Sequence, residues 1–452
     1  MTLTADALTE LTDALPGRVL RDPTEMAPFA VDTSREQLAG DPAAVVLAES
    51  TDDVSAALAW AHRHGVKVSV RGAGSGLCGG AMAYPGGLVV SLERMNRILH
   101  IDVDNRLADV QAGVITSDLD DAAHEHGLFF APDPASVRIS TVGGNIATNA
   151  GGLRCVAHGV TSDAVAALKV VLADGRVIRT GGRTRKNVTG YDLTSLFVGS
   201  EGTLGVITSA TVRLKPVPPG EPVTFHAMFD DIGAAGRAVI DIVSSPYPPE
   251  VLELLDTMSV EIIERYQHTG LPIPNAALLV GQTVGHDAPR IAEGIVGICR
   301  AAGATDAGFS ASDAMIEARR LANPALNAQG LRVSCDVGVP VSELATIFAG
   351  MDEIAQRHGR RIASVAHAGD GNLHSTVEAG ETPDEYRAAE AVIDDITRLA
   401  LSLGGTITGE HGIGSTKHHE LSWQLDENTR AAQLAIKAAL DPTGILTPDR
   451  AV

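Results

Sequence analysis

Positive charge is in short supply along this chain. Its 452 residues include 35 lysines and arginines against 56 aspartates and glutamates, which gives a formal net charge of −21. Nucleic acids and anionic lipid surfaces select proteins with basic faces, so the excess of acid argues against both as direct partners. Long apolar runs are also missing, since none approaches the roughly 18 residues of a membrane-spanning helix. We therefore expect no transmembrane segment.

Cysteine is scarce as well. The four cysteines, Cys78, Cys155, Cys299 and Cys335, are scattered along the sequence without a CxxC pair. That spacing argues against an iron–sulfur site supplied by this chain and against a disulfide framework, so we expect reduced thiols. The first residues, MTLTADALTELTDALPG, have neither the basic nor the apolar region of a signal peptide. A cytoplasmic location follows as the default expectation.

Chain length and a cluster of prolines indicate the domain organisation. At 452 residues the chain is too long for one compact core, and roughly two or three domains are expected. Four prolines between Pro216 and Pro222 mark the main boundary, because glycine-rich loops lie before them and alternating helices and strands lie after them. We predict an α+β protein with a ligand-binding domain at 1–217, a cap with an antiparallel sheet at 218–403, and a C-terminal segment at 404–452 that returns to complete the site.

The chain is predicted to open with an α/β unit. Residues 43–50 form an apolar strand, and residues 51–65 form a helix with Thr51 as its N-cap and Gly65 at its end. Residues 66–70 form a second strand, which leads directly into a glycine-rich loop.

Further elements are predicted along both domains. They are strands at 88–92, 108–113, 276–284 and 331–340, helices at 117–127 (N-cap Ser117), 288–303 and 341–359, and a hairpin at 164–180. The Asp174-Gly175 pair of this hairpin suits a type I′ turn.

The loop RGAGSGLCGG (71–80) carries Gly74, Gly76 and Gly79 in GxGxxG spacing, as a dinucleotide-binding Rossmann loop does. A Rossmann loop must open a helix, however, and the Pro-Gly-Gly of the following AMAYPGG (81–87) breaks any helix. We therefore interpret the loop as a phosphate nest, in which successive backbone N–H groups converge on a pyrophosphate.

A second glycine-rich stretch, VGGNIATNAGG (142–152), has two Gly-Gly pairs around small residues. Without Cβ atoms its backbone can lie against a flat ligand, while Asn145, Thr148 and Asn149 offer hydrogen bonds. A large planar cofactor fits this pattern, and a glycine-rich surface loop is the alternative.

Five phrases of the sequence occur together in a known family. They are RGAGSGLCGGA (71–81), DPASVRISTVGGNIATNAGG (133–152), NVTGYDLTSLFVGSEGTLGVIT (187–208), HAGDGNLH (367–374) and GEHGIG (409–414). In this order and spacing they resemble the FAD-linked D-2-hydroxy-acid dehydrogenases, a branch of the vanillyl-alcohol-oxidase-type flavoproteins. That branch includes D-lactate dehydrogenases, the glycolate oxidase flavin subunit and D-2-hydroxyglutarate dehydrogenases. The resemblance runs nearly end to end and implies that residues 1–217 form a two-subdomain FAD-binding domain of the PCMH type.

The resemblance also implies which residues contact FAD. These are Arg71, Gly72, Ala73, Gly74, Ser75, Gly76, Gly79, Pro132, Ser136, Thr141, Gly144, Asn145, Thr148, Asn149, Gly151, Gly152, Glu201, Gly205, Val206, Ile207 and Asn372. Because the phosphate loop holds no histidine, we expect the flavin to be bound without a covalent link. Cys155 and His158 are the residues that leave a covalent link open.

The stretch RIASVAHAGDGNLHSTV (361–377) is predicted to form two short strands joined by Gly-Asp-Gly-Asn. If the hairpin closes on that turn, His367 and His374 face each other with Cβ atoms about 5 Å apart and can share one metal ion. Glu410, after a predicted strand at 406–409, would be the third ligand and would leave coordination positions open for a substrate. On the hairpin alone, sheet-surface histidines are the alternative. The family resemblance favours a divalent metal: Zn, Mn or Fe.

His411 adjoins Glu410 and is the candidate catalytic base. A neutral imidazole is suited to remove a hydroxyl proton at neutral pH, and a structural histidine is the alternative. We interpret Lys417 as a solvated residue or a positive group near the site, and His418 and His419 as surface residues.

Arg319 is the candidate for binding a substrate carboxylate. The resemblance points to it through its spacing to Pro324, with neighbouring Arg320 as the alternative. A guanidinium matches the planar geometry of a carboxylate.

Two departures from the 2-hydroxyglutarate members bear on the substrate. Ser375-Thr376 follows the HAGDGNLH motif where those members place an asparagine, and Val333-Ser334-Cys335 lacks a lysine for a second carboxylate. A monocarboxylate is therefore favoured over a dicarboxylate.

We expect an FAD-dependent dehydrogenase that oxidises a small D-2-hydroxy acid, such as D-lactate or glycolate, to the 2-oxo acid. Metal-assisted deprotonation by His411 would accompany hydride transfer to flavin N5. The alternatives are a D-2-hydroxyglutarate dehydrogenase, an enzyme for another class of alcohol, and a non-redox flavin transferase resembling alkyl-dihydroxyacetone-phosphate synthase. The electron acceptor (quinone, cytochrome or flavoprotein), the need for an iron–sulfur partner subunit and a homodimeric state are left open by the sequence.

Overall fold

The protein consists of two compact units. The computed structural model describes residues 3–34, 40–330 and 332–451. Unit 1 comprises Met1–Gly151, Val160–Val217 and Glu410–Val452, and unit 2 comprises Gly152–Gly159 and Pro218–Gly409.

Unit 1 begins with a small α/β sheet. Its strand order is β1-β2-β4-β3, with β2, β4 and β3 parallel and β1 antiparallel to β2. The strands are β1 (Val19–Leu20), β2 (Ala44–Leu47), β3 (Val68–Arg71) and β4 (Leu88–Ser91). Because parallel strands need a crossover, α3 (Thr51–His64) connects β2 to β3, which confirms the predicted α/β opening.

Caps fix both ends of α3. The hydroxyl of Ser50 accepts a hydrogen bond from the N–H of Asp53, and the Asp53 carboxylate accepts one from the N–H of Ser50, which completes a capping box. The prediction of Thr51 as N-cap is therefore wrong by one residue. Gly65 ends the helix with a φ of +62°, as predicted.

A five-stranded antiparallel sheet follows in unit 1, in the order β5-β6-β10-β8-β9. Its strands are β5 (Ile98–Asp102), β6 (Leu107–Gln111), β8 (Val165–Val171), β9 (Val177–Gly181) and β10 (Val206–Arg213). The predicted hairpin is confirmed as β8 and β9. Its turn is not type I′, which requires positive φ at both central residues, because Gly175 has a φ of +88° but Asp174 does not have a positive φ.

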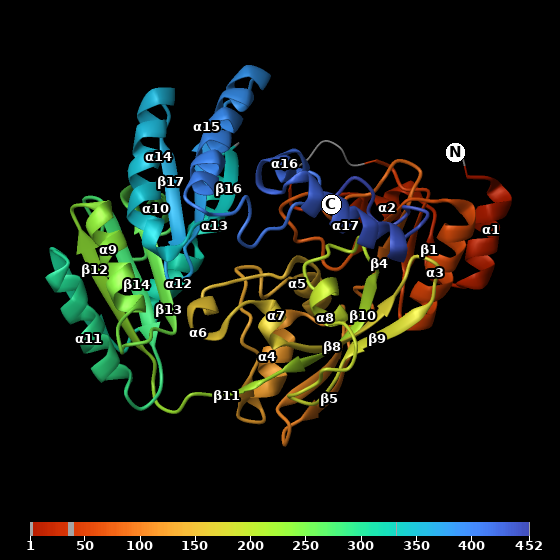
Figure 1. The fold of residues 1–452 in the computed structure, drawn as a ribbon, viewed down its shortest axis with the longest axis horizontal. Coiled ribbons are helices and arrows are strands. Elements are labelled where there is room, and N and C mark those ends of the chain that lie inside the picture. Colours follow the sequence, from red (N-terminus) through yellow and green to blue (C-terminus); the bar gives the residue numbers. More distant parts are fainter. Residues whose placement is uncertain (1–2, 35–39, 331, 452) are drawn as a thin grey trace. The chain divides into compact units, whose positions relative to one another are not determined.

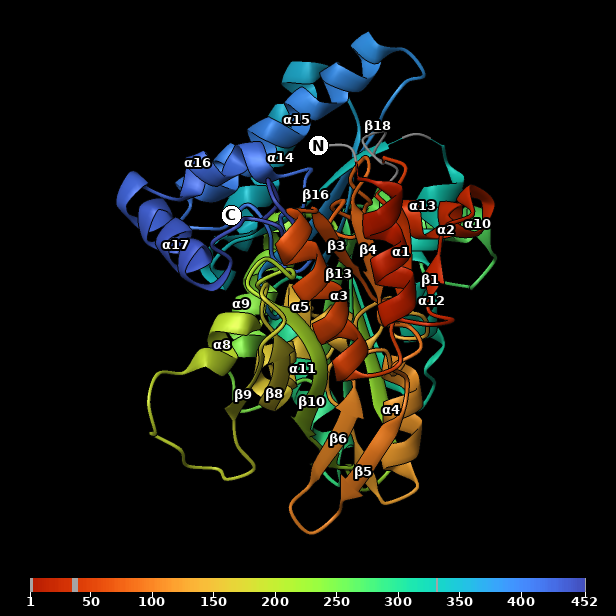
Figure 2. The same ribbon diagram turned by 90° about the vertical axis from the view of Figure 1, so that its right-hand side faces the viewer.

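Helices and a two-stranded sheet complete unit 1. Figure 2 shows α1 and α3 side by side, and Leu11 and Leu58 from these helices share a buried core with Val90 and Leu446. These elements are α1 (Ala5–Ala14), α2 (Pro23–Ala30), α4 (Thr116–His124), β7 (Leu128–Phe129), α5 (Val142–Thr148), α7 (Thr161–Ala164), α8 (Leu193–Phe197), β11 (Lys215–Pro216), the 3-10 helix η2 (His418–Glu420), α16 (Leu421–Gln424) and α17 (Glu427–Leu440). The predicted N-cap Ser117 is wrong, since α4 begins directly after Ile115 and no side chain caps it.

Unit 2 is built on a seven-stranded antiparallel sheet, in the order β15-β12-β14-β13-β17-β18-β16. Figure 1 labels β12, β14, β13, β17 and β16 of this sheet. The strands are β12 (Val223–Phe229), β13 (Val251–Asp256), β14 (Ala277–Thr283), β15 (Asp306–Ser310), β16 (Arg332–Gly338), β17 (Ile362–His367) and β18 (Asn372–Glu378). The strands predicted at 276–284 and 331–340 are confirmed as β14 and β16, with residue 331 outside the described residues. The strand predicted at 406–409 is wrong, because only an isolated bridge joins Thr406 to Gly338.

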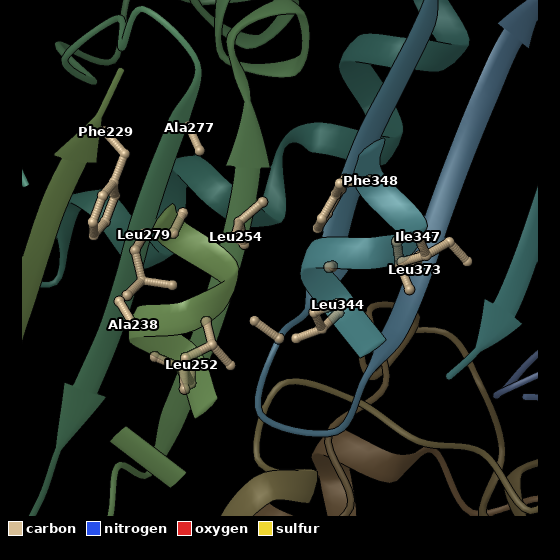
Figure 3. Close-up of a cluster of buried hydrophobic side chains, with 14 of the residues drawn as sticks. Phe229, Ala238, Leu252, Leu254, Ala277, Leu279, Leu344, Ile347, Phe348 and Leu373 are labelled. Atoms are coloured by element: carbon tan, nitrogen blue, oxygen red, sulfur yellow. The ribbon is translucent and has the colours of Figure 1, made fainter. Parts of the chain in front are cut away.

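Helices cover both faces of the unit 2 sheet. On one face, α9, α11, α14 and α15 enclose a core that includes Leu254, Ile347 and Leu373 (Figure 3). On the opposite face, α10, α12 and α13 enclose a core that includes Ile263 and Val365. The helices of unit 2 are α6 (Cys155–His158), α9 (Ile232–Val243), α10 (Thr257–Tyr266), α11 (Ala288–Ala301), α12 (Ala314–Arg320), α13 (Ala322–Ala328), the 3-10 helix η1 (Val341–Glu343), α14 (Leu344–His358) and α15 (Pro383–Ser402). Among the described helices of the two units, none has the length and hydropathy that a membrane span requires.

Candidate active site

The glycine-rich loop after β3 packs tightly at one residue and lies open at another. Residues 72–87 contain no helix, which agrees with the rejection of a Rossmann loop. Gly74 and Gly79 have φ values of +70° and +73°, a conformation that favours glycine. A Cβ added at Gly72 would lie 2.4 Å from Oγ1 of Thr141, whereas a Cβ at Gly76 would meet none of the described residues within 4 Å. Among the described residues, Gly76 therefore has room on its Cβ side, while its carbonyl accepts a hydrogen bond from the N–H of Thr33.

The stretch VGGNIATNAGG contains a short helix, α5. Its N-cap is Thr141, whose hydroxyl accepts a hydrogen bond from the N–H of Gly144 (3.1 Å), and it ends at Asn149 with a φ of +53°. A Cβ added at Gly151 would lie 2.5 Å from Oε1 of Glu410. Glycine at position 151 therefore makes room for the Glu410 carboxylate within unit 1.

The polar side chains of this stretch find partners inside unit 1. Asn145 donates through Nδ2 to Oγ1 of Thr116 at 2.7 Å, and both residues are buried. The hydroxyl of Thr148 donates to a backbone carbonyl of its own helix, and Oδ1 of Asn149 accepts from the N–H of Ser162. Their contacts to FAD remain predictions.

The remaining predicted FAD contacts are spread over both units. Gly205 packs against Val170, since a Cβ at position 205 would lie 2.6 Å from Cγ1 of that residue. Val206 and Ile207 are buried in hydrophobic cores. Arg71, Ala73, Ser75, Pro132 and Ser136 lie in unit 1, and Gly152 and Asn372 lie in unit 2.

Glu201 ties the C-terminal segment to the rest of unit 1. Its carboxylate accepts hydrogen bonds from the N–H groups of Ile413 (2.8 Å) and Gly414 (2.9 Å). Burial raises the pKa of Glu201, and the nearby cations Lys417 and Arg450 oppose that rise. Lys417 is itself buried, so the interpretation of a solvated residue is wrong. A contact between Glu201 and FAD remains a prediction.

The predicted histidine hairpin exists, with a different register. His367 pairs with Asn372, and His374 pairs with Val365, so the two histidines are diagonal neighbours on one face of the sheet. The prediction that they stand directly opposite each other is therefore wrong. Their ring centroids nevertheless lie 5.1 Å apart at an interplanar angle of 86°, and a ligating atom of each lies within 4.8 Å of the other.

A buried carboxylate holds one of these rings. Glu253 of β13 pairs in register with His367, and its Oε1 lies 2.7 Å from Nδ1 of that histidine. Its Oε2 lies 2.7 Å from Nη2 of Arg319 on α12. Glu253 and Arg319 have exposed fractions of only 0% and 5%. The predicted carboxylate ligand Arg319 thus already has a partner within unit 2.

Asp336 on β16 is a further buried polar residue, on the sheet face that carries His374. It pairs in register with His374, and its buried carboxylate accepts hydrogen bonds from the hydroxyl of Thr408 (2.9 Å) and the N–H of Gly409. A Cβ added at Gly409 would lie 2.4 Å from Nδ2 of Asn372. Unit 2 therefore fixes its last residue, which immediately precedes Glu410, beside the histidine strands.

The residues present fit both cofactors that the sequence implies. A diphosphate suits the positive φ values and open backbone of the 72–80 loop. A divalent metal suits two adjacent imidazoles, one of them oriented by a carboxylate. Asn372 adds an unused acceptor, because no hydrogen bond reaches its buried Oδ1 within the described residues.

Glu253 and Asp336 are the site residues for which the sequence predicted no role. The sequence marks both positions, since Glu253 is the acidic residue of the apolar run VLELL and Asp336 is the acidic residue of VSCDVGV. A lone acid that alternation places inside a sheet requires a partner. His411 is partly exposed in unit 1, and its role as base remains a prediction. His419 is exposed, as predicted, whereas His418 is half-buried.

Comparisons with known proteins agree with this arrangement. The FAD binding domain model matches residues 42–181, and the model for the C-terminal domain of FAD linked oxidases matches residues 219–451. The glycolate oxidase subunit GlcD of Bacillus subtilis is 42% identical over 417 residues, which cover 90% of this chain and 88% of that protein. A D-lactate dehydrogenase of Archaeoglobus fulgidus is 37% identical over 416 residues, covering 90% and 91%.

A solved structure of alkyldihydroxyacetonephosphate synthase shares the fold. It superimposes with a TM-score of 0.78 at 20% identity, covering 99% of this chain and 86% of that one. The vanillyl-alcohol-oxidase-type fold predicted from the sequence is confirmed. The chain belongs to the FAD-linked oxidoreductases, as an enzyme with an FAD binding domain followed by the C-terminal domain of the FAD linked oxidases.

Proposed function

We propose that this enzyme oxidises a small D-2-hydroxy acid, D-lactate or glycolate, to the 2-oxo acid with FAD as the oxidant. The observation that carries the proposal is the histidine pair on β17 and β18, with His367 held by the buried Glu253. The relatives named as glycolate oxidase subunit and D-lactate dehydrogenase support the substrate class. A fold shared with a synthase does not decide the chemistry, so the argument depends on these side chains.

His367, His374 and Glu410 are the proposed ligands of a divalent metal. Glu410 directly follows Gly409, which is bonded to Asp336 beside His374, and its carboxylate has room because residue 151 is glycine. A metal there would act as a Lewis acid that polarises the hydroxyl of the substrate. Zn, Mn and Fe all accept two imidazoles and a carboxylate.

His411 is the proposed base, and it accepts the proton of the substrate hydroxyl. When bound, FAD supplies the redox chemistry by taking the α-hydrogen with its electron pair at N5. The substrate thus loses two hydrogens, one as a proton and one as a hydride, and a C–O single bond becomes a carbonyl. Arg319 is proposed to bind the substrate carboxylate with the donors of its guanidinium that Glu253 does not occupy.

Whether the site can bind a second substrate carboxylate depends on the side chains of the sheet face that carries His374. Ser375 points to the opposite face, where its hydroxyl bonds Ser364, so its identity does not report on the substrate. Ser334 and Thr376 lie on the His374 face and bond each other, and neither offers a positive charge. Further along the same face, Arg332 donates to Asn327. We propose a monocarboxylate, with D-2-hydroxyglutarate as the alternative that Arg332 would favour.

The proposal is tested by anaerobic stopped-flow reduction of the bound flavin. We expect D-lactate and glycolate to bleach it faster than D-2-hydroxyglutarate, and L-lactate to be slow. Bleaching by D-2-hydroxyglutarate alone would move the assignment to the dicarboxylate. No bleaching by any 2-hydroxy acid would favour the transferase alternative.

The same purified protein can be used to examine how the flavin is attached and whether the chain turns over without a partner subunit. We propose non-covalent FAD, which acid or heat should release intact from the denatured chain. We further propose that a quinone, a cytochrome or a flavoprotein reoxidises the flavin in the cytoplasm. Turnover of the isolated chain with an artificial dye would show that chemistry needs no iron–sulfur partner, and light scattering would distinguish a monomer from a homodimer.

A further inference from the structure

We propose that Glu253 is a positioning residue of unit 2. Its single carboxylate orients both His367, a proposed metal ligand, and Arg319, the proposed binder of the substrate carboxylate. The inference rests on the proposed function, because it assigns a role to a residue behind the proposed metal. It extends that function by naming a group that touches neither substrate nor metal. Its failure can be recognised separately, as the experiment below shows.

Burial forces Glu253 to keep its partners. The side chain has no exposed surface, and an ionised carboxylate removed from water is costly unless it is paired and hydrogen-bonded. Arg319 supplies the opposite charge at 2.7 Å and is itself 6% exposed at the side chain. His367 contacts the other oxygen at 2.7 Å. Each carboxylate oxygen therefore has a nitrogen at 2.7 Å, the contact of Oε1 being a hydrogen bond and that of Oε2 an ion pair without hydrogen-bond geometry, and the negative charge is balanced within unit 2.

The contact between Glu253 and His367 selects a tautomer of the imidazole. An ionised carboxylate carries no proton, so Nδ1 of His367 must be the donor across the 2.7 Å contact. A neutral ring that carries its proton on Nδ1 keeps the lone pair on Nε2, which is the form that a divalent metal binds. The carboxylate also limits rotation of the ring, and ligand histidines in metalloproteins commonly have such a partner.

The same carboxylate fixes Arg319 without using all of its donors. Glu253 contacts Nη2, and the buried Nε donates no hydrogen bond within the described residues. A guanidinium has five N–H donors, so donors remain for a substrate carboxylate. Loss of Glu253 would therefore disturb metal affinity and substrate affinity together, although the residue would contact neither.

The sheet register explains why this position carries the acid. Glu253 and His367 are paired residues of the antiparallel strands β13 and β17, so their side chains project from the same face. Val251 and Leu255, two positions away on either side, are buried with Val365 in the core under α10 and α12. On this face of β13, Glu253 therefore lies between two apolar residues and contacts Arg319 of α12.

The test measures metal affinity by Co²⁺ titration of the chelator-treated, FAD-containing enzyme, read by the visible absorption of bound Co²⁺. The variants are Glu253→Gln and Glu253→Asp. The matched control is Glu250→Gln, because Glu250 is also a buried glutamate of unit 2 that contacts a histidine at 2.7 Å, in this case His158.

We expect Glu253→Gln to weaken Co²⁺ binding about 10- to 100-fold and to raise the KM for D-lactate. Flavin content should stay at the wild-type level. Glu253→Asp retains the charge and should recover part of the affinity, and Glu250→Gln should bind Co²⁺ as the wild type does. Wild-type affinity in Glu253→Gln would overturn the inference and leave the proposed metal site intact. A wild-type enzyme that binds no Co²⁺ would instead overturn the metal site and this inference with it.

An unpaired Arg319 in the core could prevent Glu253→Gln from folding. The double variant Glu253→Gln, Arg319→Gln removes both charges together and therefore leaves neither buried without a partner. We expect the same weakening of Co²⁺ binding in the double variant. Tight Co²⁺ binding in that variant would contradict the inference as directly as in the single one.

Discussion

The two units offer a ligand different kinds of contact. In the glycine-rich segments of unit 1, polar side chains such as Asn145 and Asn149 are bonded within the protein, and glycine leaves room for close approach at positions such as 76 among the described residues. In unit 2, one face of the antiparallel sheet carries Glu253, His367 and His374 as buried or half-buried side chains. Unit 1 should therefore be sensitive to added volume, and unit 2 to lost charge or lost ligand atoms.

The largest effect is expected from His374→Ala in unit 2. Loss of a proposed ligand removes Lewis-acid assistance that contributes several kcal/mol, so reduction of the flavin by D-lactate should slow by about 10³-fold or more. The flavin absorbance spectrum should be unchanged, because the glycine-rich segments belong to unit 1. Stopped-flow bleaching measures the first result and the resting spectrum the second.

The matched control for His374→Ala is His419→Ala. His419 has a side chain that is 61% exposed and lies outside unit 2, so its replacement should leave bleaching at the wild-type rate. If both variants bleached equally slowly, the slowing would not be specific to the proposed metal ligand, and the expected difference between the two units would be contradicted.

The next effect is expected from Gly72→Ala in unit 1. The new Cβ would lie 2.4 Å from Oγ1 of Thr141, which caps α5, so the free energy of unfolding should fall by about 1 to 3 kcal/mol and the FAD content should drop. Metal content should not change. Thermal unfolding and flavin release from the purified variant would measure the two results.

Gly76→Ala sharpens this prediction. A Cβ at position 76 meets no described residue within 4 Å, and Gly76 does not have a positive φ, so the stability of the FAD-free protein should match the wild type. If FAD lies against this backbone, its affinity should fall all the same. Wild-type FAD affinity in Gly76→Ala would show that the cofactor does not approach the loop there.

A smaller effect concerns a buried acid of unit 2 outside the proposed site. Burial raises the pKa of Asp256 to about 6, although its oxygens accept hydrogen bonds from the N–H groups of Ser259 and Ser364. Because the folded state keeps this proton to higher pH than the unfolded state, the free energy of unfolding should fall as pH rises from about 4 to 6, by at most ~3 kcal/mol.

Urea unfolding across that pH range checks the effect of Asp256. Asp256→Asn cannot ionise, so its stability should lack this component of the pH dependence. An identical slope in the variant and the wild type would place the titrating group elsewhere.

The smallest effect is expected at the helix caps of unit 1. Ser50→Ala removes one half of the capping box of α3 and should cost about 1 kcal/mol of stability. Ser117→Ala is the control, because Ser117 does not cap α4, and its effect should stay within about 0.5 kcal/mol. Chemical denaturation of the two variants distinguishes them. A larger loss of stability in Ser117→Ala would support Ser117 as the N-cap, as predicted from the sequence.

The sequence predicted the framework of both units because that framework depends on local patterns. The helix ending at Gly65, the existence of the two hairpins and the strands at 276–284 and 331–340 follow from periodicity and turn residues, and the structure confirms them, although the helix is capped by Ser50. The register of His367 and His374 was missed because it depends on how many residues form the turn. Pairing of His367 with Asn372 leaves four residues, 368–371, in that turn.

Residues that act across strands were harder to predict. Glu253 meets His367 and Arg319 from positions 114 and 66 residues away along the chain, and only the order β14-β13-β17 brings them together. Asn145 was expected at a ligand because amides hydrogen-bond; its Nδ2 donates to Thr116 inside the protein, and its contact with FAD remains a prediction. The motifs therefore located the active region, while the partners of each side chain required the tertiary fold.

The most direct test of the difference between the units is removal of metal from the wild-type enzyme. Elemental analysis would confirm removal by a chelator, and anaerobic titration with D-lactate would follow the flavin. We predict that the metal-free enzyme keeps its FAD and its spectrum, nearly loses bleaching by substrate, and recovers it when Zn²⁺, Mn²⁺ or Fe²⁺ is added. A metal-free enzyme that reduces its flavin at full speed would contradict the account and return His367 and His374 to structural roles.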